Sequence, residues 1–324
     1  MQNNNRLSLR VRRITYEAIG INSYELVDPN NADLPAFTAG SHIDVHLPSG
    51  MVRQYSLSND PAERNRYVIA VLRETNGKGG SQAMHDMVHV PDLLSVSLPR
   101  NHFALAPAGQ KHLLLGGGIG ITPLKAMAHD LAARGADFEL HYCAKEPAYL
   151  AFADEFAAWQ AAGRAGLHFD GGNPQNGLNI AALLADAAAG THVYYCGPKG
   201  FMQACADATA HWPKDHVHAE HFSAPASDGA ASASAVSDGS FAVQIASSGA
   251  TLNVPADRSL VEILHEAGLN VDTSCVSGLC GSCKVGYLSG DVDHRDYILA
   301  DDERLTHLTT CVSRSNGALL VLDL

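Results

Sequence analysis

The sequence lacks long apolar runs and has little positive charge. No stretch of about 18 apolar residues occurs among its 324 residues, so we expect no membrane-spanning helix. Against 34 Asp and Glu there are only 22 Lys and Arg, and the formal net charge is −12. Proteins that bind nucleic acid need a basic face, so that class is not expected. Residues 1–13 are polar and basic without an apolar core, which predicts no secretory signal and favours the cytoplasm.

The sequence also lacks an even set of cysteines, which argues against a disulfide framework and for metal or redox use. Three of its seven cysteines are scattered singly, and we expect Cys143 and Cys205 to be buried as small apolar residues. The other four crowd the C-terminal fifth: Cys275, Cys280, Cys283 and Cys311.

These four cysteines have the spacing of a plant-type ferredoxin. Four residues separate the first pair, two separate the next, and 27 precede the last. Two irons need four thiolates, and the small residues Ser277, Gly278, Gly281 and Ser282 let the loop wrap closely. The alternative is a zinc site, which more often has two closely spaced pairs of ligands. We predict that the four cysteines bind a [2Fe–2S] cluster.

The rest of the chain divides into regions of different pattern. Residues 1–107 show short β-like runs between turns, typical of an antiparallel barrel or sandwich. Residues 108–224 alternate strands with helices, which predicts a parallel α/β sheet. We expect a helix at 123–134, with Thr122 as its N-cap and Gly135 after its end, and another at 180–189.

A stretch rich in Ala, Ser, Gly and Asp then predicts a flexible linker over residues 225–238, although a long surface loop is the alternative. It is followed by a cysteine-containing domain at 239–324. In that domain we expect strands at 241–245, 251–254 and 319–322 and a helix at 259–267.

Two glycine-containing turns follow strands of the α/β region. In the first, Gly117, Gly118 and Gly120 precede a helix, but Ile121 stands where a dinucleotide fingerprint has its third glycine. This turn alone fits nucleotide binding and a plain tight turn equally. The second turn contains Cys196, Gly197 and Pro198. Ligands bind beyond the carboxyl ends of parallel strands, so both turns are expected to face one crevice. A core thiol remains the alternative for Cys196.

A third motif lies in the β-rich region, where Arg53, Tyr55 and Ser56 follow one another closely. An arginine binds phosphate, a tyrosine stacks on a flat ring and a hydroxyl hydrogen-bonds a ring nitrogen. The order of these motifs, R-x-Y-S-L, G-G-x-G-I-T-P, C-G-P and the cysteine set, resembles the phthalate dioxygenase reductase family, which includes vanillate O-demethylase reductases. The resemblance implies a multidomain protein with an antiparallel β-barrel flavin domain, a parallel-sheet nucleotide domain and an α+β β-grasp ferredoxin domain.

The same resemblance implies the site residues. It puts Arg53, Tyr55 and Ser56 at an FMN, with the amides of Gly79, Gly80 and Ser81 in the loop 76–81 at the FMN phosphate. It puts Thr122 between flavin and nicotinamide, Cys196, Gly197 and Pro198 at the nicotinamide, and Phe222 beside the flavin ring. A domain-boundary core residue is the alternative for Phe222. Ser56, Thr122 and Cys196 would lie at the reacting centre, and no side-chain general base is expected.

The implied function is that of a reductase component. A hydride from NADH would go to FMN, and single electrons would pass through the [2Fe–2S] cluster to a Rieske-type oxygenase or O-demethylase. NADH is expected over NADPH because the residues after the second strand, Lys145 and Glu146, include an acid and no arginine. We expect a monomer. The alternatives are an FAD-containing reductase of a diiron monooxygenase and a non-catalytic ferredoxin-type carrier.

Overall fold

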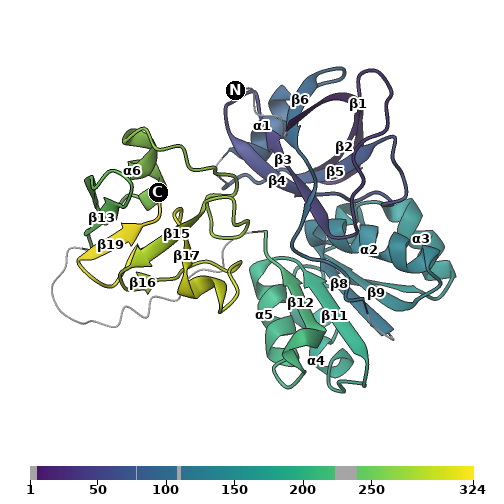
Figure 1. Cartoon of the computed structure of the whole chain (residues 1–324). Coiled ribbons are helices and arrows are strands. Elements are labelled where there is room, and N and C mark those ends of the chain that lie inside the picture. The colour runs from purple at the N-terminus through teal and green to yellow at the C-terminus, as the bar shows by residue number, and fades with distance from the viewer. Residues whose placement is uncertain (1–5, 78, 108–110, 223–238) are drawn as a thin grey trace. The chain divides into compact units, whose positions relative to one another are not determined.

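The computed structural model describes residues 6–77, 79–107, 111–222 and 239–324. The chain forms two compact units, Met1–Phe222 and Ser223–Leu324, which are described separately below (Figure 1). The expected linker at 225–238 and Lys78 of the loop 76–81 lie outside the described residues. Within the described ranges, no helix is long and apolar enough to cross a membrane.

The first unit begins with an antiparallel barrel. Its strands pair in the order β4-β3-β6-β1-β2-β5, with β7 on β3. The amide of Ser58 donates to the carbonyl of Val68 at 2.8 Å, which joins the chain after β4 to β5 and helps to close the barrel. The elements are β1 (Arg6–Ala18), β2 (Ile21–Val27), β3 (Ser41–His46), β4 (Val52–Ser56), β5 (Tyr67–Leu72), α1 (Gly80–Met87), β6 (Leu93–Ser97) and β7 (Arg100–Asn101).

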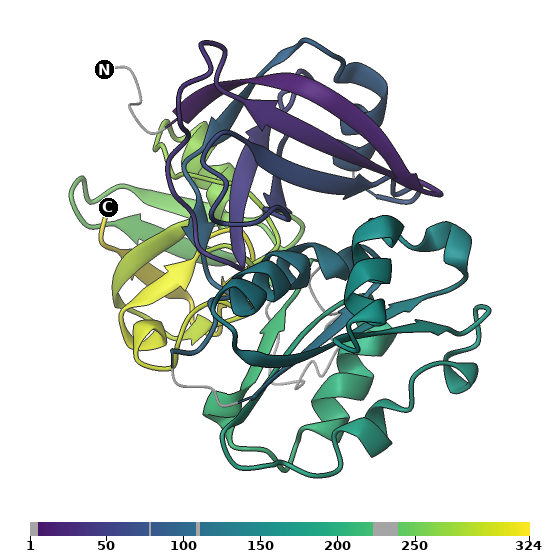
Figure 2. The ribbon, with the colours of Figure 1, turned by 90° about the vertical axis from the view of Figure 1, so that its right-hand side faces the viewer.

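A five-stranded parallel sheet of order β10-β9-β8-β11-β12 completes the first unit, as the α/β pattern predicts. Helices α2 and α3 cover the face of the sheet toward the barrel, and α4 and α5 cover the other face (Figures 1 and 2). The elements are β8 (Lys111–Gly117), η1 (Gly118–Gly120), α2 (Ile121–Ala133), β9 (Asp137–Ala144), η2 (Pro147–Tyr149), α3 (Ala153–Ala161), β10 (Ala165–Phe169), η3 (Pro174–Asn176), α4 (Ile180–Leu183), β11 (Thr191–Cys196), α5 (Lys199–Ala208), η4 (Lys214–His216) and β12 (Val217–Glu220).

Two expectations for this sheet are wrong in detail. Thr122 is not an N-cap, because the 3-10 turn η1 runs directly into α2 and Gly120 occupies the cap position. The Thr122 hydroxyl instead donates to the carbonyl of Ile119 at 3.1 Å. Helix α4 ends at Leu183 rather than at residue 189. The indole N–H of Trp212 donates a hydrogen bond to the carbonyl of Leu184. In a longer helix that carbonyl would accept from a backbone amide of the next turn, so the helix ends here.

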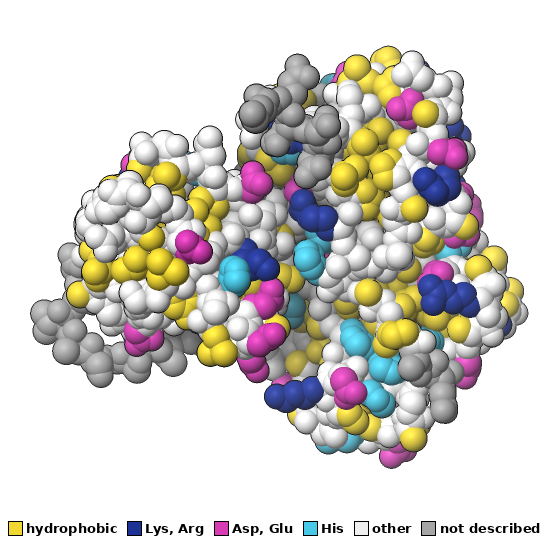
Figure 3. All heavy atoms as spheres, in the orientation of Figure 1, with side chains coloured by type: hydrophobic (Ala, Val, Ile, Leu, Met, Phe, Trp, Pro, Cys, Tyr) yellow, Lys and Arg dark blue, Asp and Glu magenta, His cyan; other side chains and the backbone are white. Residues whose placement is uncertain are grey.

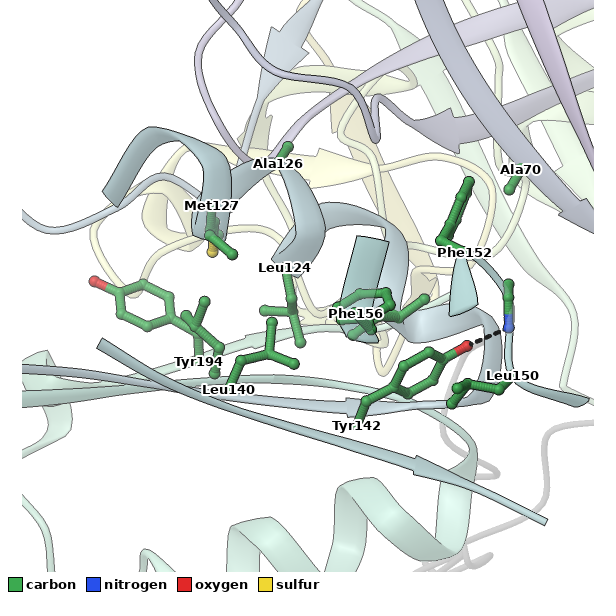
Figure 4. Packing of buried hydrophobic residues seen from close by; sticks show 14 of the residues in the cluster. Ala70, Leu124, Ala126, Met127, Leu140, Tyr142, Leu150, Phe152, Phe156 and Tyr194 are labelled. Atoms are coloured by element: carbon green, nitrogen blue, oxygen red, sulfur yellow. Dashed lines mark hydrogen bonds between the residues drawn. The ribbon is translucent and has the colours of Figure 1, made fainter. Parts of the chain in front are cut away.

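One apolar cluster runs through both parts of the first unit. It joins residues of the parallel sheet and its helices to five residues of the barrel and the chain that follows it: Ala18, Ile21, Ala39, Ala70 and Phe103. In Figure 4, Phe152 at the start of α3 lies beside Ala70 of β5, and the Tyr142 hydroxyl accepts from the amide of Ala151 at 3.1 Å. The barrel and the parallel sheet therefore share a core.

The second unit has the mixed sheet of a β-grasp fold, ordered β14-β13-β19-β15-β17, with a separate core of its own. Its helix α6 opens with a capping box in which Ser259 and Glu262 bond each other's backbone amides. The elements are β13 (Phe241–Ile245), β14 (Thr251–Val254), α6 (Leu260–Glu266), β15 (Lys284–Ser289), β16 (Val292–Asp293), η5 (Glu303–Leu305), β17 (His307–Thr309), β18 (Arg314–Ser315) and β19 (Leu319–Leu322).

Candidate functional site

Arg53 on β4 and the start of α1 form an anion-binding corner at the barrel. A Cβ on Gly80 would lie 2.3 Å from the Nε atom of Arg53, so the guanidinium side chain runs directly across this glycine. The N-cap Gly79 is left-handed at φ 83, and no side chain caps the helix. Uncapped amides at a helix start, together with an arginine, suit a phosphate group. The residues present thus fit the phosphate of FMN.

The adjoining backbone is held by side chains of the same loop. The Ser81 hydroxyl accepts from the amide of Glu74 at 3.0 Å, which leaves both its own O–H and the Ser81 amide as donors for a phosphate. The Gln82 side chain donates to the carbonyls of Glu74 and Thr75 at 3.0 and 3.1 Å. These bonds tie the chain at Glu74 and Thr75 to the start of α1.

Tyr55 lies on the same side of β4 as Arg53. Its hydroxyl is buried, and among the described residues it has no hydrogen-bond partner. Burial raises the pKa of this phenol. A neutral, unpaired hydroxyl beside the anion-binding corner is a feature that a flavin could complete.

Ser56, at the end of β4, reaches across to the parallel sheet. Its hydroxyl donates to Oε2 of Glu220 at 3.3 Å. Burial raises the pKa of Glu220 to about 8, an increase that the Ser56 hydrogen bond partly offsets. Glu220 ends β12 and pairs in register with Cys196, which ends β11. A partly buried carboxyl with a raised pKa thus joins β4 to the parallel sheet.

The two glycine-containing turns pack directly against each other. A Cβ on Gly120 would lie 2.3 Å from the carbonyl oxygen of Cys196, and a Cβ on Gly197 would lie 3.1 Å from Cα of Gly117. A Cβ on Gly117 would come within 2.9 Å of Cδ of Pro198. Larger residues would force the turns apart, so the glycines keep both turns together at the carboxyl edge of the sheet, where ligands of such sheets bind.

Three side chains expected near the flavin or the nicotinamide differ in exposure. Thr122 is 2% exposed and Cys196 is fully buried, and its pKa is raised by burial and then by Glu220. Phe222 is 44% exposed, so it is not a core residue. An exposed aromatic at the end of the sheet remains available to stack on a planar ligand.

The four predicted cysteines come together in the second unit as two pairs. The Cys275 and Cys280 thiols hydrogen-bond each other, and the Cys283 and Cys311 thiols do likewise. Within the described residues, no three His, Cys, Asp or Glu side chains converge on one metal position. Zinc needs four ligands around one ion, whereas a two-iron cluster takes two thiolates at each iron. The paired arrangement fits [2Fe–2S] better than zinc.

Backbone amides also point at these sulfurs. The amide of Leu279 lies 3.3 Å from Sγ of Cys275, and the amide of Ser282 lies 3.4 Å from Sγ of Cys280. The bond from Cys275 lowers the pKa of Cys280, and the bond from Cys311 lowers that of Cys283. The glycines make this wrapping possible, because Gly278 and Gly281 are left-handed at φ 73 and 68.

Two residues of the site were not predicted from the sequence. Glu220 lies in the segment Glu220–His221–Phe222, of which only the phenylalanine was singled out. Its place at the carboxyl end of a parallel strand was the available signal. Lys125, a buried lysine of α2, has no motif around it and is found only from the structure.

Comparisons with known proteins agree with this geometry. Residues 114–207 match the oxidoreductase NAD-binding domain, and residues 243–316 match the 2Fe-2S iron-sulfur cluster binding domain. The reductase subunit of tert-butanol monooxygenase / tert-amyl alcohol desaturase from Aquincola tertiaricarbonis is 56% identical, over 98% of this chain and 96% of its own. Phthalate dioxygenase reductase from Burkholderia cepacia is 43% identical, over 98% and 97%.

Solved structures show the same likeness. A structure of phthalate dioxygenase reductase matches with a TM-score of 0.76 and 42% identity, over 100% of this chain and 99% of that one. An intact type IV self-sufficient cytochrome P450 monooxygenase matches with a TM-score of 0.83 and 36% identity, over 98% of this chain but 41% of that one. The chain belongs to the phthalate dioxygenase reductase family of NADH oxidoreductases, whose cofactors are FMN and a [2Fe–2S] cluster.

Proposed function

We propose that this chain is the reductase component of a Rieske-type oxygenase or O-demethylase system and works as a cytoplasmic monomer. The observation that carries the proposal is a contact between β4, the proposed flavin strand, and the parallel sheet, the proposed nucleotide sheet. Ser56 and Glu220 make this contact, 3.3 Å apart, and the same chain brings four cysteines together in pairs. Bound FMN accepts a hydride and releases single electrons, which the cluster carries one at a time.

The residues of the first unit have separate tasks in this proposal. Arg53 and the amides of Gly79, Gly80 and Ser81 hold the FMN phosphate, and Tyr55 and Phe222 border the flavin ring. Gly117, Gly118 and Gly120 let the NADH pyrophosphate approach the start of α2. Thr122, Cys196, Gly197 and Pro198 line the nicotinamide side, and Ser56 with Glu220 bounds the space between the two rings.

The second unit would deliver the electrons. Cys275, Cys280, Cys283 and Cys311 would hold the cluster. The domain at 239–324 carries 11 acidic and 5 basic residues, a net charge of −6, and acidic side chains appear among apolar ones on the face that Figure 3 presents. Such a surface attracts a basic docking patch on the oxygenase. Electron flow is downhill, because Rieske centres have higher potentials than plant-type clusters.

The test is reduction of purified Rieske oxygenases by this chain and NADH, followed in a stopped-flow spectrophotometer. The panel should include phthalate, vanillate and tertiary-alcohol systems, the last because of the relative at 56% identity. The rate with the cognate oxygenase should fall as ionic strength rises past about 0.1 M, where the Debye length is about 10 Å. A rate that stays flat or rises would refute electrostatic docking.

Two further results would change the assignment. Transfer to a diiron monooxygenase but to no Rieske protein, together with release of FAD on acid treatment, would favour the diiron alternative. Matching rates with NADPH would overturn the preference for NADH that Glu146 suggests.

A further inference from the structure

Lys125 is a buried lysine between the barrel and the parallel sheet. It is only 3% exposed, and lysine is rarely buried unless it is paired. It lies on α2 four residues after Ile121, where the helix begins, and thus about 6 Å along the axis from the glycine turn. No step of the proposed mechanism uses this side chain.

Its ammonium group contacts three residues. Nζ donates to the carbonyl of Ser58 at 3.0 Å and lies 2.7 Å from Oε2 of Glu155, in the first turn of α3. It also lies 4.6 Å from the centre of the Phe152 ring. Ser58 comes two residues after Ser56, so this one group connects the end of the flavin strand to the two helices of the nucleotide sheet.

The partners of Lys125 are themselves held in place. The Ser58 amide and hydroxyl both donate to the carbonyl of Val68, at 2.8 and 3.0 Å. Glu155 also contacts Nε2 of His129 at 3.4 Å. Burial alone would raise the pKa of Glu155, but the bond from His129 and the charge of Lys125 outweigh it and lower the pKa.

Phe152 adds a second observation. It has φ 58, a left-handed conformation that a phenylalanine adopts only at a cost in free energy. Its ring lies under the ammonium group and belongs to the apolar cluster that includes Ala70 of the barrel (Figure 4). The contacts around Lys125 therefore include an ion pair, a hydrogen bond and apolar packing. Together they restrict movement of α2 relative to β4.

We infer that Lys125 is a positioning residue, which holds the nucleotide-binding turn of α2 in register with the flavin strand and so aligns nicotinamide and flavin. The inference rests on the roles proposed above for Ser56 and the glycine turn. A group of this kind acts on the rate of hydride transfer and much less on the affinity for NADH, because misalignment of reacting atoms is costly even when binding is intact.

The test compares Lys125→Met with the wild-type chain. The methionine side chain is one atom shorter than that of lysine, and it keeps the apolar contacts of the stem but loses the charge. FMN and iron content should be unchanged, and the dissociation constant of NADH should change less than about twofold. The rate of flavin reduction should fall about tenfold, and the long-wavelength absorbance of stacked nicotinamide and flavin should weaken. Lys111→Met is the matched control, because Lys111 makes an exposed ion pair with Glu139 at 3.1 Å on the same sheet.

If Lys125→Met fails to fold, Glu155→Gln is the second test of the inference. The Glu155 side chain is 46% exposed, so we expect this variant to fold. It should slow flavin reduction about threefold at unchanged NADH affinity. Wild-type rates in the folded variants, or a loss of affinity in proportion to the loss of rate, would overturn the inference. A wild-type chain that NADH does not reduce would instead refute the proposed function.

Discussion

At the residue scale, the carboxyl of Glu220 and the hydroxyl of Ser56 form a polar contact between β4 and the parallel sheet. In the proposed function, the raised pKa of this carboxyl keeps it uncharged near pH 7, so that it adds no negative charge beside the two rings. Once ionised, it would repel the negative charge of the incoming hydride. The pH at which Glu220 loses its proton therefore bears on activity as well as on stability.

We expect Glu220→Gln to remove a pH dependence of both properties. The folded pKa of about 8 lies above the ordinary 4.5, so the stabilising effect of the bound proton is complete below pH 4.5 and is lost as pH rises through 8. The wild-type rate of flavin reduction by NADH should fall above about pH 8. The measurements are melting temperature and single-turnover rate from about pH 5 to pH 9. A wild-type step that persists unchanged in the glutamine variant would assign it to another group.

At the element scale, the start of α1 is shaped by the contact between Gly80 and Arg53. We expect Gly80→Ala to weaken FMN binding, because the new methyl would lie 2.3 Å from Nε of Arg53 and push the guanidinium away. Losing a charge-assisted hydrogen bond of about 1.5–3 kcal/mol corresponds to at least about tenfold in affinity. Flavin fluorescence on dilution measures it.

The control for this change is Gly200→Ala in α5, where a Cβ would have nothing within 4 Å. It should leave FMN affinity unchanged. Unaltered affinity in Gly80→Ala as well would mean that Arg53 does not hold the phosphate.

Element boundaries show what the sequence can and cannot predict. Strands β13, β14 and β19 begin and end where their apolar patterns predict, because each buries alternate residues in one core. Helix α1 was missed because it opens with Gly-Ser and lies against the barrel, where tertiary contacts outweigh weak local propensity. The end of α4 is not predicted either, because it depends on a hydrogen bond from Trp212 to the carbonyl of Leu184, 28 residues away.

The candidate site likewise has residues that the sequence predicts and residues that it does not. The cysteine ligands follow from spacing alone, because one loop and one distant strand end must supply them. The contacts of Glu220 and Lys125 cannot be predicted from spacing, because each joins segments more than 60 residues apart in sequence. Only the packing of the barrel against the parallel sheet brings those partners together.

At the scale of the whole molecule, the two units have separate apolar cores. We therefore expect Cys280→Ser to abolish the cluster and reduction of the oxygenase, while flavin reduction by NADH stays within about twofold of the wild-type rate. Iron and sulfide content, single-turnover flavin reduction and oxygenase reduction are the three measurements. Equal loss of all activities would contradict this independence of the two units.

The core that the barrel shares with the parallel sheet also bears on how such genes recombine. A crossover between codons 101 and 111 would join the barrel of one parent to the parallel sheet of another. The apolar cluster that includes Ala70 and Phe103 would then be built from two mismatched parts. A crossover between codons 222 and 241 divides none of the apolar clusters that the described residues form. Natural fusions and laboratory chimaeras should therefore inherit the first 222 residues as one block and exchange the ferredoxin portion freely.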